Sequence, residues 1–316
     1  MRKDVSVRQL PTGERMRIIK HRYVPLGLGE TEVSYLPRAC VVTGIHGDEL
    51  EGQLAIYELV RRIRQAPQHL AGVLDIYPAV NPMGIGAMER GIPQFDLDMD
   101  RIFPGNGAAS PYEAIAADLV ADVKGAQVAF DLHASNIYLR EVPQIRIDEV
   151  SAERVLPLAR LANVDLVWVH PHEVVLKGTF AHAMNSLGVP TLVVEAGVGM
   201  RATPEVGEQL AIGMLSVLAE MGVWTGPIPL VRAPQEDSGH TVGNLFAEKA
   251  GLFVPSVAFG KVVSAGQPIG HVVDSGAGMV VQEMRAPTNG LLFSLRVYPL
   301  VYPGDLVARV LGEGPC

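Results

Sequence analysis

Between residues 39 and 221 the sequence alternates short apolar runs with longer segments that have the period of a helix. The apolar runs are rich in β-branched residues and end at Gly, Pro or polar residues, which is the pattern of buried strands. We expect strands at 39–43, 74–80, 127–133, 166–169 and 191–195. We expect helices at 49–64, 110–123, 151–162, 179–187 and 203–221. Strands that alternate with such helices predict an α/β fold with a mixed, mostly parallel sheet flanked by helices.

Two of these helices carry specific signals. In the first, apolar residues recur at the spacing of one buried helical face, at Ile56, Leu59, Val60 and Ile63. In the second, Ser110 is the expected N-cap, Pro111 occupies the first turn and Glu113 completes a capping box. The Gly- and Pro-rich segment 83–107 has neither pattern, and we expect a long functional loop there.

The two ends of the chain have a different texture. Residues 1–38 are weakly patterned and predict one or two lead-in strands, whereas three prolines within 227–234 indicate a linker. Beyond the linker, Gly251 and Gly290 open two similar units rich in Val, Gly and turn residues, which predicts a small pseudo-symmetric β-sandwich or barrel. We therefore expect an α/β domain at 1–226 and a C-terminal β-domain at 227–316. The β-domain resembles the barrel-sandwich shape of biotinyl and lipoyl domains, but no lysine lies at the modification turn, so we expect no carrier function.

The charge balance bears on the class of partner. The formal net charge of −8 argues against a nucleic-acid binder, and we find no run of about eighteen apolar residues that would span a membrane. The N-terminus lacks the apolar core of a signal peptide. Two cysteines, Cys40 and Cys316, cannot make a disulfide framework, and we interpret Cys40 as a small buried hydrophobic residue. These features favour the cytoplasm.

Three potential metal ligands stand at the ends of predicted strands. His46 and Glu49 follow the strand 39–43, and His133 ends the strand 127–133. Because the carboxyl ends of parallel strands meet at one edge of a sheet, these side chains can converge. Two imidazoles and a carboxylate are a usual ligand set of catalytic zinc, which keeps one position open for water or substrate. One histidine among the nine is more often a surface or core residue, but that explanation is weak for all three residues together.

Two further acidic residues stand beside them in the pattern. Asp131 lies two residues before His133, on the same face of its strand, where it can orient the imidazole. Glu195 ends the strand 191–195 and precedes a Gly-rich turn, a place where burial and a nearby metal tune the pKa of a carboxyl. We expect Glu195 to act as a general base that takes a proton from the attacking water and passes it to the leaving nitrogen. The alternative is a structural carboxylate that caps loop amides.

Four short motifs occur in a recognisable order, at 46–49 (HGDE), 98–105 (DMDRIFPG), 131–133 (DLH) and 194–197 (VEAG). Together they resemble the succinylglutamate desuccinylase/aspartoacylase family, relatives of the zinc carboxypeptidases. The resemblance covers most of residues 38–222, and the C-terminal β-domain also resembles the one that this family carries. It implies a zinc-carboxypeptidase-like fold.

The same resemblance implies an activity. One Zn²⁺ per chain would be held by His46, Glu49 and His133, with Glu195 as general base. The expected reaction is hydrolysis of the amide bond of a small N-acyl amino acid or related amide, with a metal-activated water as the nucleophile.

The resemblance also assigns residues of the long loop. Arg101 matches the family arginine that holds a substrate carboxylate with its forked donors, and Arg90 matches the one that polarises the scissile carbonyl and steadies the oxyanion. The alternative for Arg90 is a solvated loop charge. The spacing between Arg90 and Arg101 resembles the spacing in the subgroup that includes N-acetyl-diaminobutyrate deacetylases. Asp100 replaces the usual family asparagine, so it either pairs with Arg101 or faces a cationic or neutral group of the substrate. Asn81, just before the loop, is a further substrate-binding candidate.

Other polar residues near these motifs are candidates for shaping the pocket. Arg140 and Arg146 follow His133 closely. The segment His170-Pro171-His172 has no matching carboxylate cluster in the sequence, so we favour specificity residues or plain surface residues over a second metal site.

Two other functions share parts of this pattern. A metallocarboxypeptidase acting on peptides would use the same constellation, and a non-catalytic scaffold could keep the fold. We expect a small-molecule N-acyl substrate, no nucleic acid and no membrane as partners. A β-domain with unpaired edges also favours a homo-oligomer.

Overall fold

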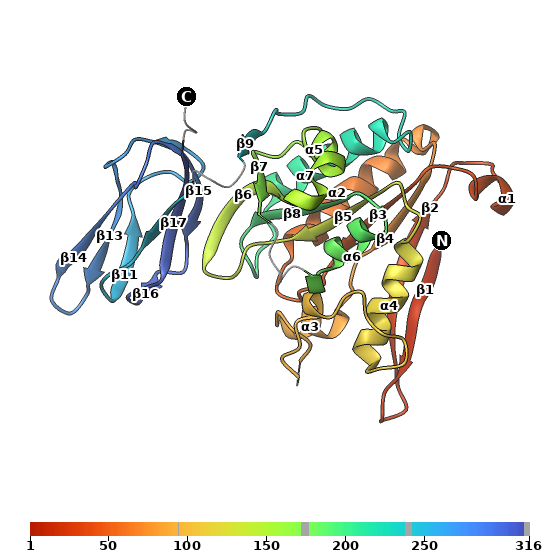
Figure 1. Ribbon diagram of the computed structural model, residues 1–316, viewed down its shortest axis with the longest axis horizontal. Helices are drawn as coiled ribbons and strands as arrows, with labels where there is room; N and C mark the ends of the chain where they lie inside the picture. The colour runs from red at the N-terminus through yellow and green to blue at the C-terminus, as the bar shows by residue number, and fades with distance from the viewer. Residues whose placement is uncertain (94, 172–176, 238–241, 313–316) are drawn as a thin grey trace.

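The computed structural model describes residues 1–93, 95–171, 177–237 and 242–312. Its largest sheet runs in the order β1-β2-β4-β3-β5-β8-β6-β15-β17-β10, with β12, β7 and β9 attached at its side (Figure 1). A separate sheet has the order β14-β13-β11-β16. Strands β4, β3, β5 and β8 are parallel neighbours, whereas β2 pairs with β4, and β6 with β8, in antiparallel fashion. The sheet is therefore mixed, with a parallel centre.

The strands of the larger body are β1 (Arg2–Gln9), β2 (Arg15–Tyr23), β3 (Arg38–Thr43), β4 (Val73–Tyr77), β5 (Val128–His133), β6 (Leu139–Asp148), β7 (Leu166–His170), β8 (Thr191–Gly197) and β9 (Gln235–Asp237). Its α-helices are α1 (Glu30–Val33), α2 (Glu51–Gln65), α3 (Pro82–Ala87), α4 (Pro111–Val123), α5 (Ala152–Ala159), α6 (Phe180–Ser186) and α7 (Pro204–Glu220). Short 3₁₀ turns are η1 (Pro67–His69), η2 (Met99–Arg101) and η3 (Glu149–Ser151). The expected strands and helices of this body are confirmed, with shifted ends.

Helices cover both faces of the parallel centre (Figure 1). Val41 of β3 packs in the core cluster that contains α2, α5 and α7, whereas its neighbours Cys40 and Val42 pack in the cluster that contains α4 and α6. Successive side chains of a strand point to opposite faces, and with both faces covered the strand is apolar throughout. Cys40 is fully buried, as expected, and burial raises the pKa of its thiol to about 12. Cys316 lies outside the described residues.

The sequence prediction was incomplete in two places. The segment 83–107 is not a plain loop, because it contains most of α3 and the turn η2. Asn81 accepts a hydrogen bond from the Gly84 N–H at the start of α3, and Pro82 follows it, which is a usual helix start. The strand β6 was not expected, because its buried positions include the polar residues Glu141 and Gln144, which interrupt an apolar run.

The C-terminal strands form two layers around their own core. They are β10 (Val242–Phe246), β11 (Gly251–Pro255), β12 (Val262–Val263), β13 (Pro268–Asp274), β14 (Met279–Arg285), β15 (Gly290–Arg296), β16 (Leu300–Val301) and β17 (Leu306–Gly312). The expected repeat is present, since β11–β13 and β15–β17 follow one another at similar spacing. At the start of β15 only glycine fits, because a Cβ on Gly290 would lie 1.7 Å from the Leu311 carbonyl oxygen.

The C-terminal strands also extend the central sheet. Strand β15 pairs with β6 in antiparallel register, with Ser294 opposite Glu141 and Arg296 opposite Leu139. Figure 1 shows β15 and β17 beside β6, where the two bodies meet. The division of the chain at residue 226 stays a prediction.

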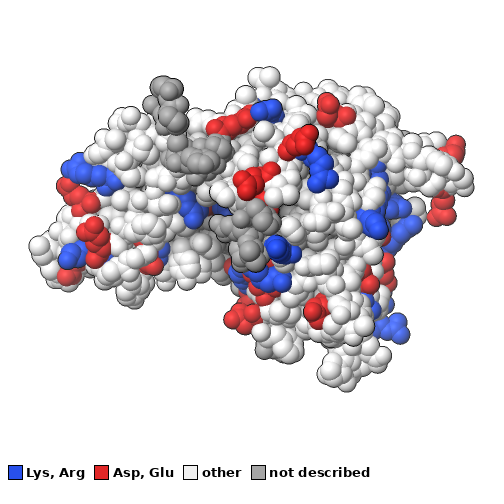
Figure 2. Space-filling model, viewed as in Figure 1, with Lys and Arg blue, Asp and Glu red and all other residues white. Residues whose placement is uncertain are grey.

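The sequence analysis also expects neither nucleic acid nor a membrane as a partner. Figure 2 shows acidic and basic side chains interspersed over one face of the molecule. That nucleic acid is not a partner stays a prediction from net charge. Within the described ranges, no helix is both long and apolar enough to cross a bilayer.

A buried carboxylate ties the lead-in strands to the sheet. Asp75 of β4 is fully buried, and Arg22 of β2 donates to its two oxygens at 2.7 and 2.6 Å. Lys20 and Arg38 approach the same carboxylate at 3.4 and 3.3 Å. Burial alone would raise the pKa of Asp75, but these cations outweigh burial and lower it.

Asp75→Asn should therefore destabilise the protein by about 3 kcal/mol at pH 7, the usual cost of breaking a buried ion pair. A carboxyl with a lowered folded-state pKa stabilises above its ordinary pKa of about 3.9 and loses that stabilisation as pH falls through the folded value. The variant should thus lose less stability than the parent below about pH 4. Urea unfolding at a series of pH values measures both effects.

The matched control is Asp4→Asn, because Asp4 forms an exposed pair with Arg17 at 3.6 Å. Its effect should stay within about 0.5 kcal/mol. An Asp75→Asn variant as stable as this control would contradict the account of the buried cluster.

Candidate active site

The loop after β3 carries the first two candidate ligands. Gly44 has φ +69° and turns the chain out of the strand. Gly47 lies against α3, where an added Cβ would be 2.0 Å from the Gly84 carbonyl carbon, and its N–H donates to the Arg90 carbonyl. The two glycines therefore allow a tight loop, which presents His46 and Glu49 toward the end of β5.

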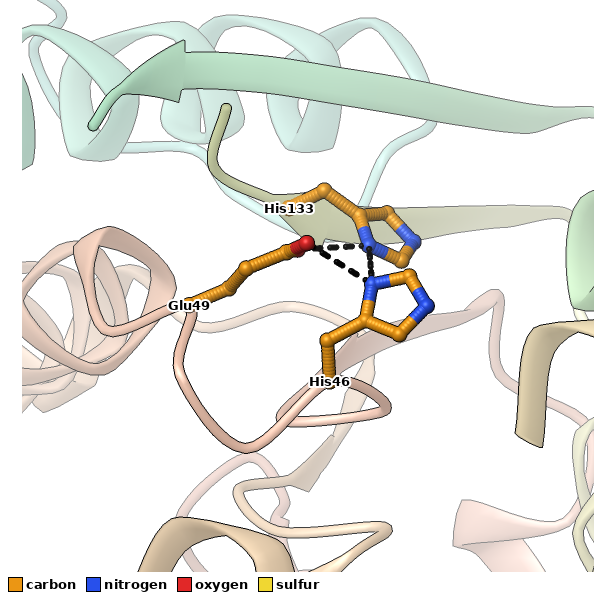
Figure 3. A group of neighbouring side chains, drawn as sticks. All are labelled: His46, Glu49 and His133. Carbon is orange, nitrogen blue, oxygen red and sulfur yellow. Dashed lines mark hydrogen bonds and ion pairs between the residues drawn. The ribbon is translucent and has the colours of Figure 1, made fainter. Parts of the chain in front are cut away.

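His46, Glu49 and His133 lie together, as the sequence predicts (Figure 3). The Nδ1 atoms of the two histidines are 3.1 Å apart. Glu49 Oε1 is 2.8 Å from His46 Nδ1, and Glu49 Oε2 is 2.9 Å from His133 Nδ1. All three side chains are at most 4% exposed, so this is a buried polar group.

Each histidine has a second carboxylate on its far nitrogen. Asp131 Oδ1 lies 3.0 Å from His133 Nε2, where the sequence placed it, and Asp98 Oδ1 lies 3.1 Å from His46 Nε2. Carboxylates in this position keep the proton on Nε2, so that Nδ1 has a free lone pair. Asp98 stands in the motif 98–105, but the sequence analysis gave it no role. It lies 52 residues after His46, and no local sequence pattern predicts a contact over that distance.

The donor set fits a divalent cation. With both Nε2 atoms protonated, two lone pairs and a carboxylate face one another at about 3 Å, an arrangement that needs a positive charge among them. Two histidines and a glutamate with open space beside them match a catalytic zinc site. Without a metal, protons supply that charge. Burial lowers the pKa of His46, but Glu49 and Asp98 outweigh it and raise the pKa to about 9. The pKa of Glu49 is lowered against its burial by the two histidines.

Glu195 reaches the same place from β8. The parallel register sets it opposite His133, at the carboxyl end of both strands. Its side chain is 16% exposed, and Arg146 Nη1 lies 3.5 Å from its Oε1. Burial raises the pKa of Glu195 to about 7, although Arg146 opposes the shift. A carboxyl with a pKa near neutrality can both take and return a proton.

A single cavity of about 570 Å³ joins these groups. Among its lining residues are the three candidate ligands, Glu195 and Asp131, together with Arg90, Asp100, Arg101, Glu141, Arg146 and Arg309. Arg90 Nη1 donates to Glu49 Oε1 at 2.8 Å, and its Nη2 donates to Asp98 Oδ2 at 3.4 Å. The side chain is 44% exposed, so its other N–H groups are left for a ligand. Of the pocket-shaping candidates, Arg146 lines the cavity, whereas Arg140 stacks on Phe259.

Of the three substrate-binding candidates, Asp100 and Arg101 line the cavity and Asn81 does not. Asp100 is buried and accepts the Phe180 N–H at 2.9 Å, while Arg101 donates to the Asp100 backbone carbonyl and lies 3.9 Å from its carboxylate. Burial and the charge of Asp131 raise the pKa of Asp100 to about 6. Asn81 is not among the lining residues, because its side chain caps α3 and donates to the Gly91 carbonyl.

Sequence reasoning missed Glu141 and Arg309 altogether. Glu141 comes from the unexpected strand β6, and Arg309 comes from β17 of the C-terminal body. No local pattern links two residues so far apart in sequence. Of the expected pocket residues, His170 lines the cavity, and His172 lies outside the described residues.

Comparison with known proteins gives one family. The family model described as the succinylglutamate desuccinylase/aspartoacylase catalytic domain matches residues 35–221. A curated relative, the N-alpha-acetyl-L-2,4-diaminobutyric acid deacetylase of Halomonas elongata, is 29% identical over 285 residues, which cover 87% of this chain and 82% of the relative.

Solved structures share the fold. The product-bound ectoine utilization protein EutE (DoeB) of Ruegeria pomeroyi has a TM-score of 0.80 and 22% identity, over 97% of this chain and 93% of that one. A succinylglutamate desuccinylase/aspartoacylase of Rhodobacter sphaeroides has a TM-score of 0.79 and 23% identity, over 99% and 95% of the two chains. The C-terminal strands are part of this shared architecture, since both matches cover nearly the whole chain.

The geometry predicts a metal site that depends on the buried histidines. His46→Ala and His133→Ala should each abolish stoichiometric binding of a divalent metal, because each removes one of three protein ligands. His170→Ala is the control, since His170 lines the same cavity outside the cluster, and it should keep the metal of the parent. Elemental analysis after dialysis against metal-free buffer measures the content. A His46→Ala variant with as much metal as the parent would refute this site.

Proposed function

The chain belongs to the succinylglutamate desuccinylase/aspartoacylase family, and from this premise we propose that it is a zinc-dependent hydrolase of the amide bond in a small N-acyl amino acid. The observation that carries the proposal is that a buried His46–Glu49–His133 group shares one cavity with Glu195 and with free donors of Arg90. We propose one zinc ion per chain. The family membership supports the reaction type, and the donor set supports the metal.

The proposed chemistry assigns each side chain one task. When bound by His46, Glu49 and His133, zinc would supply a Lewis acid that polarises the substrate carbonyl and acidifies the attacking water. Glu195 takes the proton of that water and returns it to the leaving nitrogen, for which its near-neutral pKa is suited. Arg90 donates to the oxygen of the scissile carbonyl as negative charge develops there.

The substrate class is part of the proposal. Arg101, which lines the cavity and is 45% exposed at its side chain, would hold the carboxylate of the amino acid. Asp100 adds a buried acidic group beside the site, which disfavours a second anionic group on the substrate. The curated relative is named for an acetylated diamino acid, and we propose an N-acyl amino acid with a basic side chain here.

A peptide substrate is less well supported. Arg309 of the C-terminal β-domain lines the cavity, so that domain forms part of its wall and limits the room for a longer chain. The metallocarboxypeptidase function is therefore the second candidate.

Glu195→Gln tests the proposed general base. We expect kcat to fall by about 10³-fold, because the amide cannot accept the proton, while metal content stays that of the parent. Glu283→Gln on the exposed face of β14 is the control and should leave kcat unchanged. The measurement is the release of free amine, together with elemental analysis. Full activity in Glu195→Gln would remove the base from the mechanism.

A substrate panel tests the proposed class. N-acetyl, N-succinyl and N-formyl amino acids with basic, neutral and acidic side chains are compared by kcat/KM. Basic side chains should be preferred over acidic ones by at least about 10-fold, since one unfavourable charge contact is worth more than about 1.4 kcal/mol in a buried site. Asp100→Asn should narrow this ratio. An unchanged ratio in that variant would exclude Asp100 as a determinant of side-chain preference. If no member of the panel were hydrolysed, the proposed function would be contradicted.

A further inference from the structure

The junction between β6 and β15 places two charged residues of distant origin in contact. Ser294 of β15 is opposite both Glu141 of β6 and Arg309 of β17, so the register brings Glu141 and Arg309 to the two sides of one strand. Arg309 Nη1 donates to Glu141 Oε1 at 3.0 Å. These residues are 168 positions apart, and they link the C-terminal β-domain to the cavity that both of them line.

Glu141 is held from more than one direction. Its side chain is 1% exposed. Oε2 accepts from Gln144 Nε2 at 2.8 Å and from Arg146 Nη2 at 2.6 Å, while Oε1 accepts from Arg309. The two oxygens therefore serve two different guanidinium groups, and the plane of the carboxylate is fixed between them.

Arg146 contacts both Glu141 and Glu195. Its Nη2 is bound to Glu141, and its other terminal nitrogen, Nη1, lies 3.5 Å from Glu195 Oε1. The Trp168 ring lies against both guanidinium groups, at 5.7 Å from Arg146 and 5.9 Å from Arg309. The Arg146 guanidinium is 29% exposed and lies between two carboxylates. It can point one terminal nitrogen at each of them only while neither carboxylate takes both Nη1 and Nη2.

The donor that Arg309 supplies to Glu141 Oε1 bears on which arrangement is favoured. Without it, Glu141 Oε1 would be a buried acceptor with no donor, which is costly. The carboxylate would then rotate to engage the two terminal nitrogens of Arg146, Nη1 and Nη2, with both oxygens, because a bidentate pair is the stronger arrangement. Arg146 would turn its Nη1 away from Glu195 and leave that carboxylate without its cation.

We propose that Arg309 of the C-terminal β-domain is a positioning residue of the hydrolytic site, which acts through Glu141 to hold Arg146 against Glu195. The inference rests on the proposed function, in which Glu195 is the general base. It gives the C-terminal β-domain a part in catalysis beyond forming the wall of the cavity.

Arg309→Met tests the proposal by kinetics, since it removes the guanidinium and keeps an apolar stem. We expect kcat to fall about 10- to 100-fold, as for a misplaced catalytic group, and KM to change by less than about twofold. Arg309→Lys, which keeps a cation near Glu141, should restore part of kcat. In an Arg146→Met background the further change Arg309→Met should add nothing, because the chain of contacts is already broken.

The matched control is Arg285→Met, since Arg285 belongs to the same domain and pairs with exposed Glu283 outside the cavity. It should keep the kcat and KM of the parent. A raised KM at unchanged kcat in Arg309→Met would make Arg309 a substrate contact and overturn the proposal. Unchanged kcat and KM would overturn it as well, even if the melting temperature fell. Should the Met variant not fold, Arg309→Gln takes its place under the same criteria.

A crystal structure of Arg309→Met gives a second, independent readout. We expect both oxygens of Glu141 on Arg146, and Arg146 Nη1 moved beyond about 4 Å from Glu195. An Arg146 that stays at its 3.5 Å position would overturn the proposal. This readout needs no substrate, so it decides the positioning even if the panel of N-acyl amino acids shows no hydrolysis and the proposed function alone fails.

Discussion

The carboxylate of Glu49 lies almost entirely out of water, between the imidazoles of His46 and His133. Such a group is expensive to bury unless a positive charge compensates it. The protein supplies part of that charge from Arg90, at 2.8 Å, and fixes both imidazoles from behind with Asp98 and Asp131. The two histidines, their carboxylate partners and Arg90 surround this one buried charge, and a divalent cation is the partner that its geometry fits.

The fold brings the site together through one sheet. The parallel register of β3, β5 and β8 places strand ends from three distant segments at the same edge, and β6 continues the sheet toward the C-terminal strands. The architecture therefore has two roles. The parallel centre gathers the potential ligands and Glu195, and the antiparallel extension brings Arg309 to the far wall of the cavity.

Much of this arrangement could be predicted from the sequence, and the limits have a physical reason. His46, His133 and Glu195 each stand at the end of an apolar run, where strand direction alone predicts convergence. Glu141 and Arg309 stand in no such pattern. Glu141 is buried where Gln144, Arg146 and Arg309 donate to its oxygens, and a sequence pattern that tracks apolar residues cannot register a polar position whose partner is 168 residues away.

Anomalous X-ray diffraction at the zinc absorption edge, from crystals of the protein prepared with zinc, tests the central claim most directly. The account predicts one strong peak per chain, about 2.0–2.2 Å from His46 Nδ1, His133 Nδ1 and an oxygen of Glu49. A map with no peak among these three side chains, or with its strongest peak elsewhere, would contradict it.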